Sequence, residues 1–145
     1  MKKQFIAKDF IIITLITSVW VHAYQLVRFF AYVRAAVQDY LPMVPNLAPM
    51  DNVGTLLIWG AWDTLLTALY VFLFWLCAQV FGNNRKSVLL SGVVSWGLFF
   101  VLYWTGNANM NLIGWQTLLI ILPLTFFEPL VASIIASKLY SKKEA

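Results

Sequence analysis

The chain has 145 residues, of which 61% are hydrophobic, 17% aromatic and 11% charged, and its formal net charge is +4. Soluble domains carry about 25% charged residues, so this composition excludes an ordinary soluble domain of this length. It predicts a single all-α integral membrane domain over residues 1–145, with the bilayer as its main solvent. The basic residues gather at the ends of apolar segments, as membrane topology requires, which argues against a nucleic-acid partner.

Four apolar segments follow one another along the chain: 10–33, 55–81, 87–104 and 115–139. Each is close to or above the length of about 20 residues that a helical crossing needs. A helix satisfies all its backbone groups internally, so the sequence predicts an antiparallel bundle of four transmembrane helices. The residues "VHA" at 21–23 resemble a signal-peptide cleavage site, but apolar residues continue to Val33. This continuation favours an uncleaved first helix.

Lysine and arginine are distributed unevenly between the two sides of such a bundle. With both termini inside, only Arg28 and Arg34 fall outside, against eight basic residues inside: Lys2, Lys3, Lys8, Arg85, Lys86, Lys138, Lys142 and Lys143. This bias sets orientation. We therefore expect both termini in the cytoplasm and a location in a plasma membrane of the bacterial inner-membrane type. An aromatic belt is then expected at the outer interface, from Trp59, Trp62, Trp104 and Trp115.

The two expected outer loops differ in character. The first, residues 34–54, contains "QDYLPMVPNLAPMDN" at 38–52, with prolines at 42, 45 and 49 between apolar residues. Proline at this density disfavours a regular helix. This loop is expected either to lie in the outer headgroup layer or to fold over the mouth of the bundle. The second, "TGNANMNLIG" at 105–114, is short and polar, which is typical of an ordinary turn.

Small residues at helical spacing predict the faces on which the helices pack. They occur on the second helix at Gly60, Thr64 and Ala68, on the third at Ser91, Gly92, Ser95 and Gly97, and on the fourth at Ala132, Ser133, Ala136 and Ser137. The pattern leaves open whether these faces pack within one chain or between copies.

Three ionisable side chains fall inside the predicted helices, where a charge is expensive and usually paired. With a rise of about 1.5 Å per residue, Asp63 lies roughly 12 Å below the outer surface, at a depth that His22 can share. Glu128 lies deeper, roughly 20 Å from the outside. Arg28 is the expected partner of Asp63, unless it reaches to the outer phosphates instead. Tyr24 and Gln25, on the same helix as Arg28, are further possible hydrogen-bond donors.

Glu128 stands between two prolines of the fourth helix, Pro123 and Pro129. Each proline removes one helix hydrogen bond, which frees the carbonyls of Leu119 and Thr125. A carboxyl beside freed carbonyls in an interrupted helix suits a cation or a proton. The alternative is that Glu128 only holds helices together, because prolines are common in membrane helices.

Motifs for enzymatic chemistry are largely missing from the sequence. One histidine and one cysteine cannot supply a usual zinc or haem site, and no phosphate loop or nucleophile elbow occurs. We expect no catalytic residue, metal or cofactor. The candidate ligand- or ion-binding residues are Asp63, Glu128, His22, Arg28, Tyr24, Trp59 and Trp62.

Three functions remain open on this basis. The first is a transporter or carrier of a cation- or proton-coupled solute, with a path through Glu128 and Asp63 that forms most easily between copies. The second is a binding module for a lipid, a sterol-like molecule or another apolar ligand beneath the outer tryptophans. The third is an accessory subunit of a larger membrane complex. The expected partners are therefore membrane lipids, a small solute, and either further copies of the chain or a larger assembly.

Overall fold

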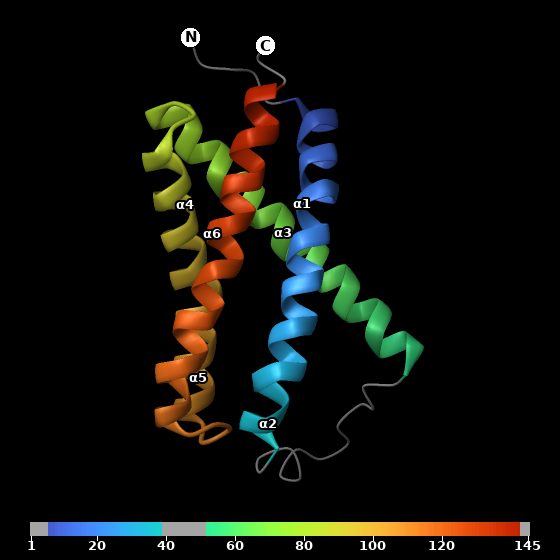
Figure 1. Ribbon diagram of the computed structural model, residues 1–145, viewed down its shortest axis with the longest axis vertical. Helices are drawn as coiled ribbons and strands as arrows, with labels where there is room; N and C mark the ends of the chain where they lie inside the picture. Colours follow the sequence, from blue (N-terminus) through green and yellow to red (C-terminus); the bar gives the residue numbers. More distant parts are fainter. Residues whose placement is uncertain (1–5, 39–51, 143–145) are drawn as a thin grey trace.

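The computed structural model of this chain describes residues 6–38 and 52–142, and these residues fold into helices joined by short turns (Figure 1). Within the described ranges there is no strand. Four helical stretches are long and apolar enough to span a membrane: Ala7–Ala36, Val53–Phe81, Arg85–Asn109 and Trp115–Ser141. The prediction of an all-α chain with four such helices is confirmed. The proline-rich outer loop falls almost wholly outside the described residues.

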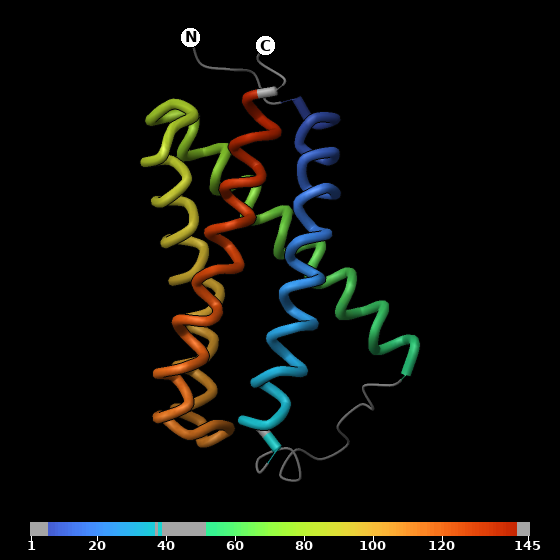
Figure 2. The backbone as a smooth tube through the Cα atoms, viewed as in Figure 1, coloured from blue at the N-terminus to red at the C-terminus, as the bar shows by residue number. Residues whose placement is uncertain are grey.

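The four stretches run antiparallel to their neighbours in the sequence. Helix α1 (Ala7–Arg28) begins at the end of the bundle where α6 (Leu118–Lys142) finishes, here called the terminal end. Helix α3 (Val53–Phe81) meets α4 (Arg85–Trp96) at that same end. The tube in Figure 2 shows α3 crossing the other helices obliquely. The opposite end, the far end, holds α5 (Leu102–Asn109) and the 3-10 turn η4 (Trp115–Thr117).

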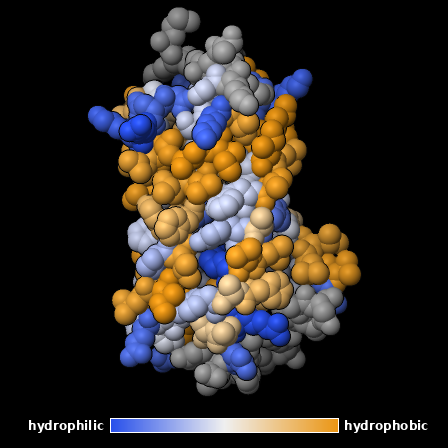
Figure 3. All heavy atoms as spheres, in the orientation of Figure 1, coloured by the Kyte–Doolittle hydropathy of each residue, from blue (hydrophilic) through white to orange (hydrophobic). Residues whose placement is uncertain are grey.

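Charge and hydropathy vary along the bundle axis. The first turns of α1 and α4 and the last turns of α6 carry Lys8, Arg85, Lys86 and Lys138, which places these basic residues at the terminal end. Below them Figure 3 shows a band of mostly apolar side chains. A charged end above an apolar band is the surface expected of a helix bundle that stands in a bilayer.

The turn between α3 and α4 shows how local sequence sets the helix ends. Helix α3 ends at Gly82, whose φ of 78° is favourable for glycine but not for residues with a side chain. Two residues later, the side chain of Asn84 accepts hydrogen bonds from the backbone N–H groups of Lys86 and Ser87. These bonds satisfy donors that the first turn of α4 leaves free. The chain therefore reverses within three residues.

Two of the long helices contain a π-helical turn. The first helix passes from α1 into η1 (Phe29–Val33) and then α2 (Arg34–Val37). The third passes from α4 into η3 (Gly97–Val101) and then α5. In a π turn the hydrogen bonds reach five residues along the chain instead of four. The spacing of apolar residues at 3.6 residues per turn gives no sign of a π turn, and none was predicted from the sequence.

The segment 105–114, expected as a turn, is helical as far as Asn109, so that prediction was wrong in its first half. Side-chain hydrogen bonds explain the extension. The Thr105 hydroxyl donates to the carbonyl of Val101 at 2.6 Å, and the Asn107 amide donates to the carbonyl of Tyr103 at 2.8 Å. These polar residues therefore bond back onto the helix that precedes them instead of ending it. The actual turn begins at Met110.

Helix α6 continues without interruption through Pro123 and Pro129, so the expectation of an interrupted helix was wrong. A proline removes only one bond of the ladder. In a membrane helix, groups on neighbouring helices can compensate for that loss. Side chains of α1 and α4 do donate hydrogen bonds to α6, as described below, but to the carbonyls of Leu122, Leu124 and Glu128, none of which a proline frees.

The small residues of α4 and α6 form a packing face between these two helices, as predicted. The hydroxyls of Ser91 and Ser133 are 3.0 Å apart and hydrogen bonded, and both residues are fully buried. Next to them, a Cβ atom placed on Gly92 would lie only 3.1 Å from the Cα of Leu130. The ridge predicted on α3 has a different role, because Gly60, Thr64 and Ala68 line a groove.

Aromatic and aliphatic side chains fill the far half of the interior. This core contains Val21, Leu66, Tyr70, Phe100, Trp104, Ala108, Ile113, Leu118, Ile121 and Ala132. Trp104 was expected in the interfacial belt, but it is only 9% exposed because it lies on the inner face of α5. The belt prediction is wrong for this residue.

We predict that Gly92→Val destabilises the bundle. The new methyl groups would meet the α6 backbone at Leu130, and overpacking of this kind costs about 1–3 kcal/mol. Thermal unfolding in detergent micelles, followed by circular dichroism, measures the change. Gly106→Val is the matched control, because a Cβ atom there meets nothing within 4 Å. Equal melting temperatures for the two variants would contradict close packing of α4 on α6.

Candidate functional site

Five polar side chains from three helices meet inside the bundle. They are Gln25 and Arg28 of α1, Asp63 and Tyr70 of α3, and Glu128 of α6, and we call them the polar cluster. Tyr70 and Glu128 are 0% exposed, and Arg28 and Asp63 are each 8% exposed. The cluster is therefore closed to the surroundings of the bundle on all but a small part of its surface.

An ion pair between α1 and α6 forms the centre of the cluster. The Nη2 atom of Arg28 lies 3.1 Å from Oε2 of Glu128. The other carboxylate oxygen, Oε1, accepts a hydrogen bond of 3.0 Å from the Tyr70 hydroxyl. The Gln25 amide lies 3.5 Å from the same oxygen. Glu128 thus has partners on two other helices, which is the arrangement a buried carboxylate needs in an apolar medium.

Gln25 connects the ion pair to Asp63. Its amide oxygen accepts a hydrogen bond of 2.6 Å from Nη2 of Arg28. Its amide nitrogen donates to Oδ1 of Asp63 at 3.1 Å. The two ends of one amide therefore join the guanidinium on one side to a second carboxyl on the other. The Thr67 hydroxyl adds a hydrogen bond of 2.7 Å to the backbone carbonyl of Asp63.

The guanidinium of Arg28 packs on an aromatic ring on its remaining side. Its central carbon lies 5.0 Å from the centroid of the Phe100 ring, which belongs to the π turn η3. Within the described residues, Nε and Nη1 have no hydrogen-bond acceptor. The ring face supplies negative charge density in their place, an interaction that contributes about 2 kcal/mol when desolvated.

Three aromatic donors hold the proline-containing part of α6. The Trp20 indole donates to the carbonyl of Glu128 at 3.2 Å, and the Tyr24 hydroxyl donates to the carbonyl of Leu124 at 2.6 Å. From α4, the Trp96 indole donates to the carbonyl of Leu122 at 2.9 Å. These three carbonyls next to the prolines are therefore bonded to side chains of other helices, but they are not the carbonyls of Leu119 and Thr125 that the prolines free.

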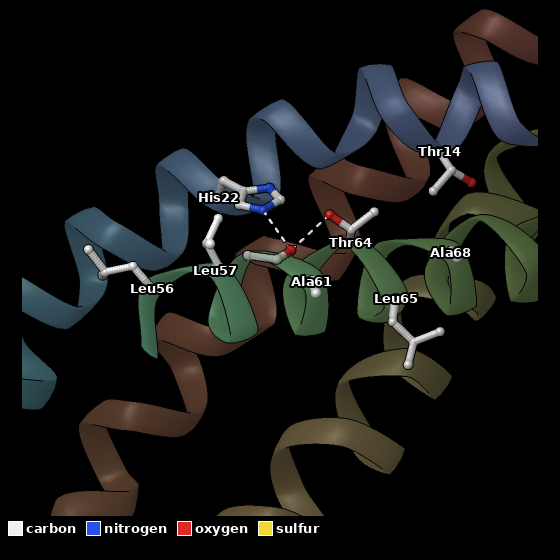
Figure 4. Close-up of a pocket in the computed structure, with 9 residues that line it drawn as sticks. Thr14, His22, Leu56, Leu57, Ala61, Thr64, Leu65 and Ala68 are labelled. Carbon is white, nitrogen blue, oxygen red and sulfur yellow. Dashed lines mark hydrogen bonds between the residues drawn. The ribbon is translucent and has the colours of Figure 1, made fainter. Parts of the chain in front are cut away.

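His22 lies beside the cluster, at the seam between α1 and α3. Its two ring nitrogens are 2.6 Å from the carbonyl oxygen of Ser18 and 3.1 Å from that of Gly60. The Gly60 carbonyl also accepts a hydrogen bond of 2.8 Å from the Thr64 hydroxyl, as the dashed lines in Figure 4 show. His22 is half-buried, and both of its ring nitrogens contact backbone carbonyls and not a carboxyl of the cluster.

A groove of about 650 Å³ runs along this seam. It is lined by small and apolar residues with three polar ones among them: Thr14, His22, Leu56, Leu57, Gly60, Ala61, Thr64, Leu65 and Ala68. Figure 4 shows Leu56 and Leu57 at one end, the His22 ring above Ala61, and Thr14 at the other end. The groove is open on the outer surface of the bundle, where a bilayer would surround it.

The structure brings together some of the predicted site residues and separates others. Asp63, Glu128 and Arg28 belong to one cluster. The predicted partner of Arg28 was Asp63, but its ion pair is with Glu128. The alternative that Arg28 reaches the outer phosphates is also wrong, because Arg28 is buried. Trp59 and Trp62 are 49% and 58% exposed and lie outside the cluster and the groove lining. They are directed toward the lipid.

One member of the cluster, Tyr70, was missed, although the sequence contains a signal for it. Tyr70 stands seven residues after Asp63, which places both on one face of α3. A search for polar residues in phase with each intramembrane charge would have found it. Gln25 was expected only as a possible hydrogen-bond donor, and the structure shows it bonded to both Asp63 and Arg28.

Comparisons with protein-family models, characterised proteins and solved structures found no match to this chain. Among the described residues, no three His, Cys, Asp or Glu side chains gather as a metal site would require.

We predict that Arg28→Gln and Glu128→Gln are each strongly destabilising and that the double variant recovers part of the loss. Removing one partner leaves the other charge buried and unpaired, which costs about 3–5 kcal/mol. A double-mutant cycle on thermal unfolding in detergent measures the coupling, which for such pairs is about 0.5–3 kcal/mol. Additive effects would show that the two side chains do not stabilise each other.

Proposed function

We propose that this protein is a small membrane carrier that exchanges a proton for a monovalent cation at the polar cluster. The observation that supports this proposal best is the imbalance of charge inside the bundle. Two carboxyls, Asp63 and Glu128, face one guanidinium, Arg28, in a space with almost no access to solvent.

The charge count explains why such a site would exchange ions. With both carboxyls ionised the cluster carries one net negative charge, and one proton or one monovalent cation makes it neutral. Burial of a net charge in an apolar medium is expensive. The neutral forms are therefore favoured, and a proton and a cation compete for the same position.

The orientation expected for this carrier has both termini in the cytoplasm, in a plasma membrane of the bacterial inner-membrane type. Eight basic residues on the terminal side against two on the other support this orientation. The cluster then lies nearer the outer face, because Arg28 stands more than twenty residues along the first helix from Ala7.

The closed state of the cluster implies that transport needs either a rearrangement of helices or a path between copies. Four helices of this size enclose little volume, and Glu128 is fully buried. We therefore propose that the functional unit contains further copies of the chain, and that membrane lipids complete its surroundings. Association of this kind would use lipid-facing surfaces and leave the cluster within each copy intact.

Binding of a lipid or another apolar ligand is a second candidate function. The groove between α1 and α3 favours it, because its lining is mostly apolar and it contains His22 as a polar group. A protein with this function would bind such a ligand without moving protons. The assay below separates the two functions.

We predict that a cation added outside proteoliposomes drives protons out of them through the wild-type protein. Liposomes loaded with a fluorescent pH indicator would report a rise of internal pH after addition of Na⁺, K⁺, guanidinium or tetraphenylphosphonium. Glu128→Gln and Asp63→Asn should each lower the rate to that of empty liposomes, because each leaves the cluster without its net negative charge.

Asp9→Asn is the matched control for this assay. It also removes one carboxyl, but from the first turn of α1 and outside the cluster. It should leave the flux unchanged. Flux in Glu128→Gln equal to that of the wild type would overturn the proposal, provided that both proteins are folded and reconstituted to the same density. Ligand binding with no flux for any of the four cations would favour the second candidate.

A further inference from the structure

We infer that the groove between α1 and α3 is a lateral entrance from the bilayer to the polar cluster, and that the cation it admits is lipophilic. Such a cation combines an apolar body with a single positive charge. This inference rests on the proposed function, because it names the class of cation that the carrier takes and the way by which it arrives.

The groove and the cluster occupy neighbouring faces of the same two helices. On the groove side, α1 and α3 are joined by the contact between the His22 ring and the Gly60 carbonyl. On the interior side they are joined by the hydrogen bond from Gln25 to Asp63, which stand three residues after His22 and Gly60 in the sequence. A ligand in the groove is therefore separated from the Asp63 carboxyl only by the α1–α3 seam.

The size and lining of the groove fit the apolar part of such a cation. Sites for organic ligands usually have volumes of about 300–1,000 Å³ and mostly apolar walls. The groove has a volume of about 650 Å³, and most of its lining residues are aliphatic, with Leu56 and Leu57 at one end. Thr14 lines the other end and is 6% exposed, and its buried hydroxyl has no hydrogen-bond partner among the described residues.

Charge complementarity selects a cation over a neutral or anionic lipid. The cluster behind the seam has two carboxyls and one guanidinium, so a single positive charge completes it. A lipid phosphate or a fatty-acid carboxylate would instead approach two carboxyls. The occupant we propose is therefore an organic monocation, with its charge directed toward Asp63 and its body in the groove.

The far end of the bundle does not offer a polar alternative within the described residues. Between the cluster and that end lie apolar or aromatic core residues, among them Phe100, Trp104, Leu118 and Ile121. A small inorganic ion would have to shed its water to pass them, at a large desolvation penalty. A lipophilic cation avoids this penalty because it partitions into the bilayer first and enters from the side.

The contact that closes the seam is also one that can open at small cost. The Gly60 carbonyl oxygen lies 3.1 Å from a ring nitrogen of His22 and accepts a hydrogen bond of 2.8 Å from the Thr64 hydroxyl. If the His22 ring turns away, the Thr64 hydroxyl still satisfies that carbonyl, so no buried acceptor is left without a partner. Gly60 has no side chain, which leaves the entrance free at this position.

The test is binding of tetraphenylphosphonium to the full-length protein in nanodiscs, measured by equilibrium dialysis. The wild type should bind it saturably, and Asp63→Asn should lose that binding. Ala61→Phe fills the groove below His22 and should weaken binding by about tenfold or more, since even one misplaced group in an apolar pocket has an effect of this size. Ala23→Phe, on an exposed face of α1 outside the groove lining, is the matched control and should bind as the wild type does.

The outcomes separate this inference from the proposed function. Equal affinity of Ala61→Phe and the wild type, with both variants folded by circular dichroism, would overturn the groove as the entrance. If tetraphenylphosphonium did not bind, but Na⁺ or K⁺ drove proton exit that depends on Asp63 and Glu128, the inference of a lipophilic cation would be wrong. The proposed carrier function would still hold. Binding that both variants lose, but that drives no proton exit, would support the groove and overturn the carrier.

Discussion

The ion pair between Arg28 and Glu128 constrains the rest of this structure. Two opposite charges inside a bundle that stands in hydrocarbon are tolerable only if they stay together and keep their remaining hydrogen bonds. Gln25 and Tyr70 supply such bonds, and the Phe100 ring covers the guanidinium. Each of these side chains comes from a helix whose position is thereby fixed. The pair lies between α1 and α6, and α3 and η3 close around it.

Packing elsewhere in the bundle follows a different principle. Lipid tails are as apolar as leucine side chains, so helices in a membrane associate through close contact and through polar groups. The interface of α4 with α6 has both, in the bond from Ser91 to Ser133 and the approach of Gly92 to Leu130. The seam of α1 with α3 has small residues without the same close approach. That difference is the reason why one interface is filled and the other contains a groove.

The sequence was sufficient to predict four long apolar helices and the intramembrane charges Arg28, Asp63 and Glu128, but not the contacts among these charges. Helix length and hydropathy can be read directly from the sequence pattern. The partner of Arg28 cannot, because the sequence does not fix how the helices that carry Asp63 and Glu128 rotate and cross. Interhelix geometry decides between them. Likewise, tryptophan near the end of an apolar segment is typical of the membrane interface. Only the rotation of α5 about its axis shows that the Trp104 side chain is directed inward. The two prolines of α6 were misjudged because each removes only one hydrogen bond of the ladder, and the remaining bonds keep the helix continuous.

The two π turns stand on either side of the contact between Arg28 and Phe100. The turn Phe29–Val33 begins directly after the arginine, and the turn Gly97–Val101 contains the phenylalanine. A π turn is equivalent to one residue inserted into an α-helix. A helical wheel drawn with a single phase therefore assigns the wrong face to residues beyond Arg28 on the first helix and beyond Trp96 on the third. It also follows that a homologue one residue shorter at either place could form a regular α-helix there, with the end beyond the deletion presenting the same faces to the ion pair.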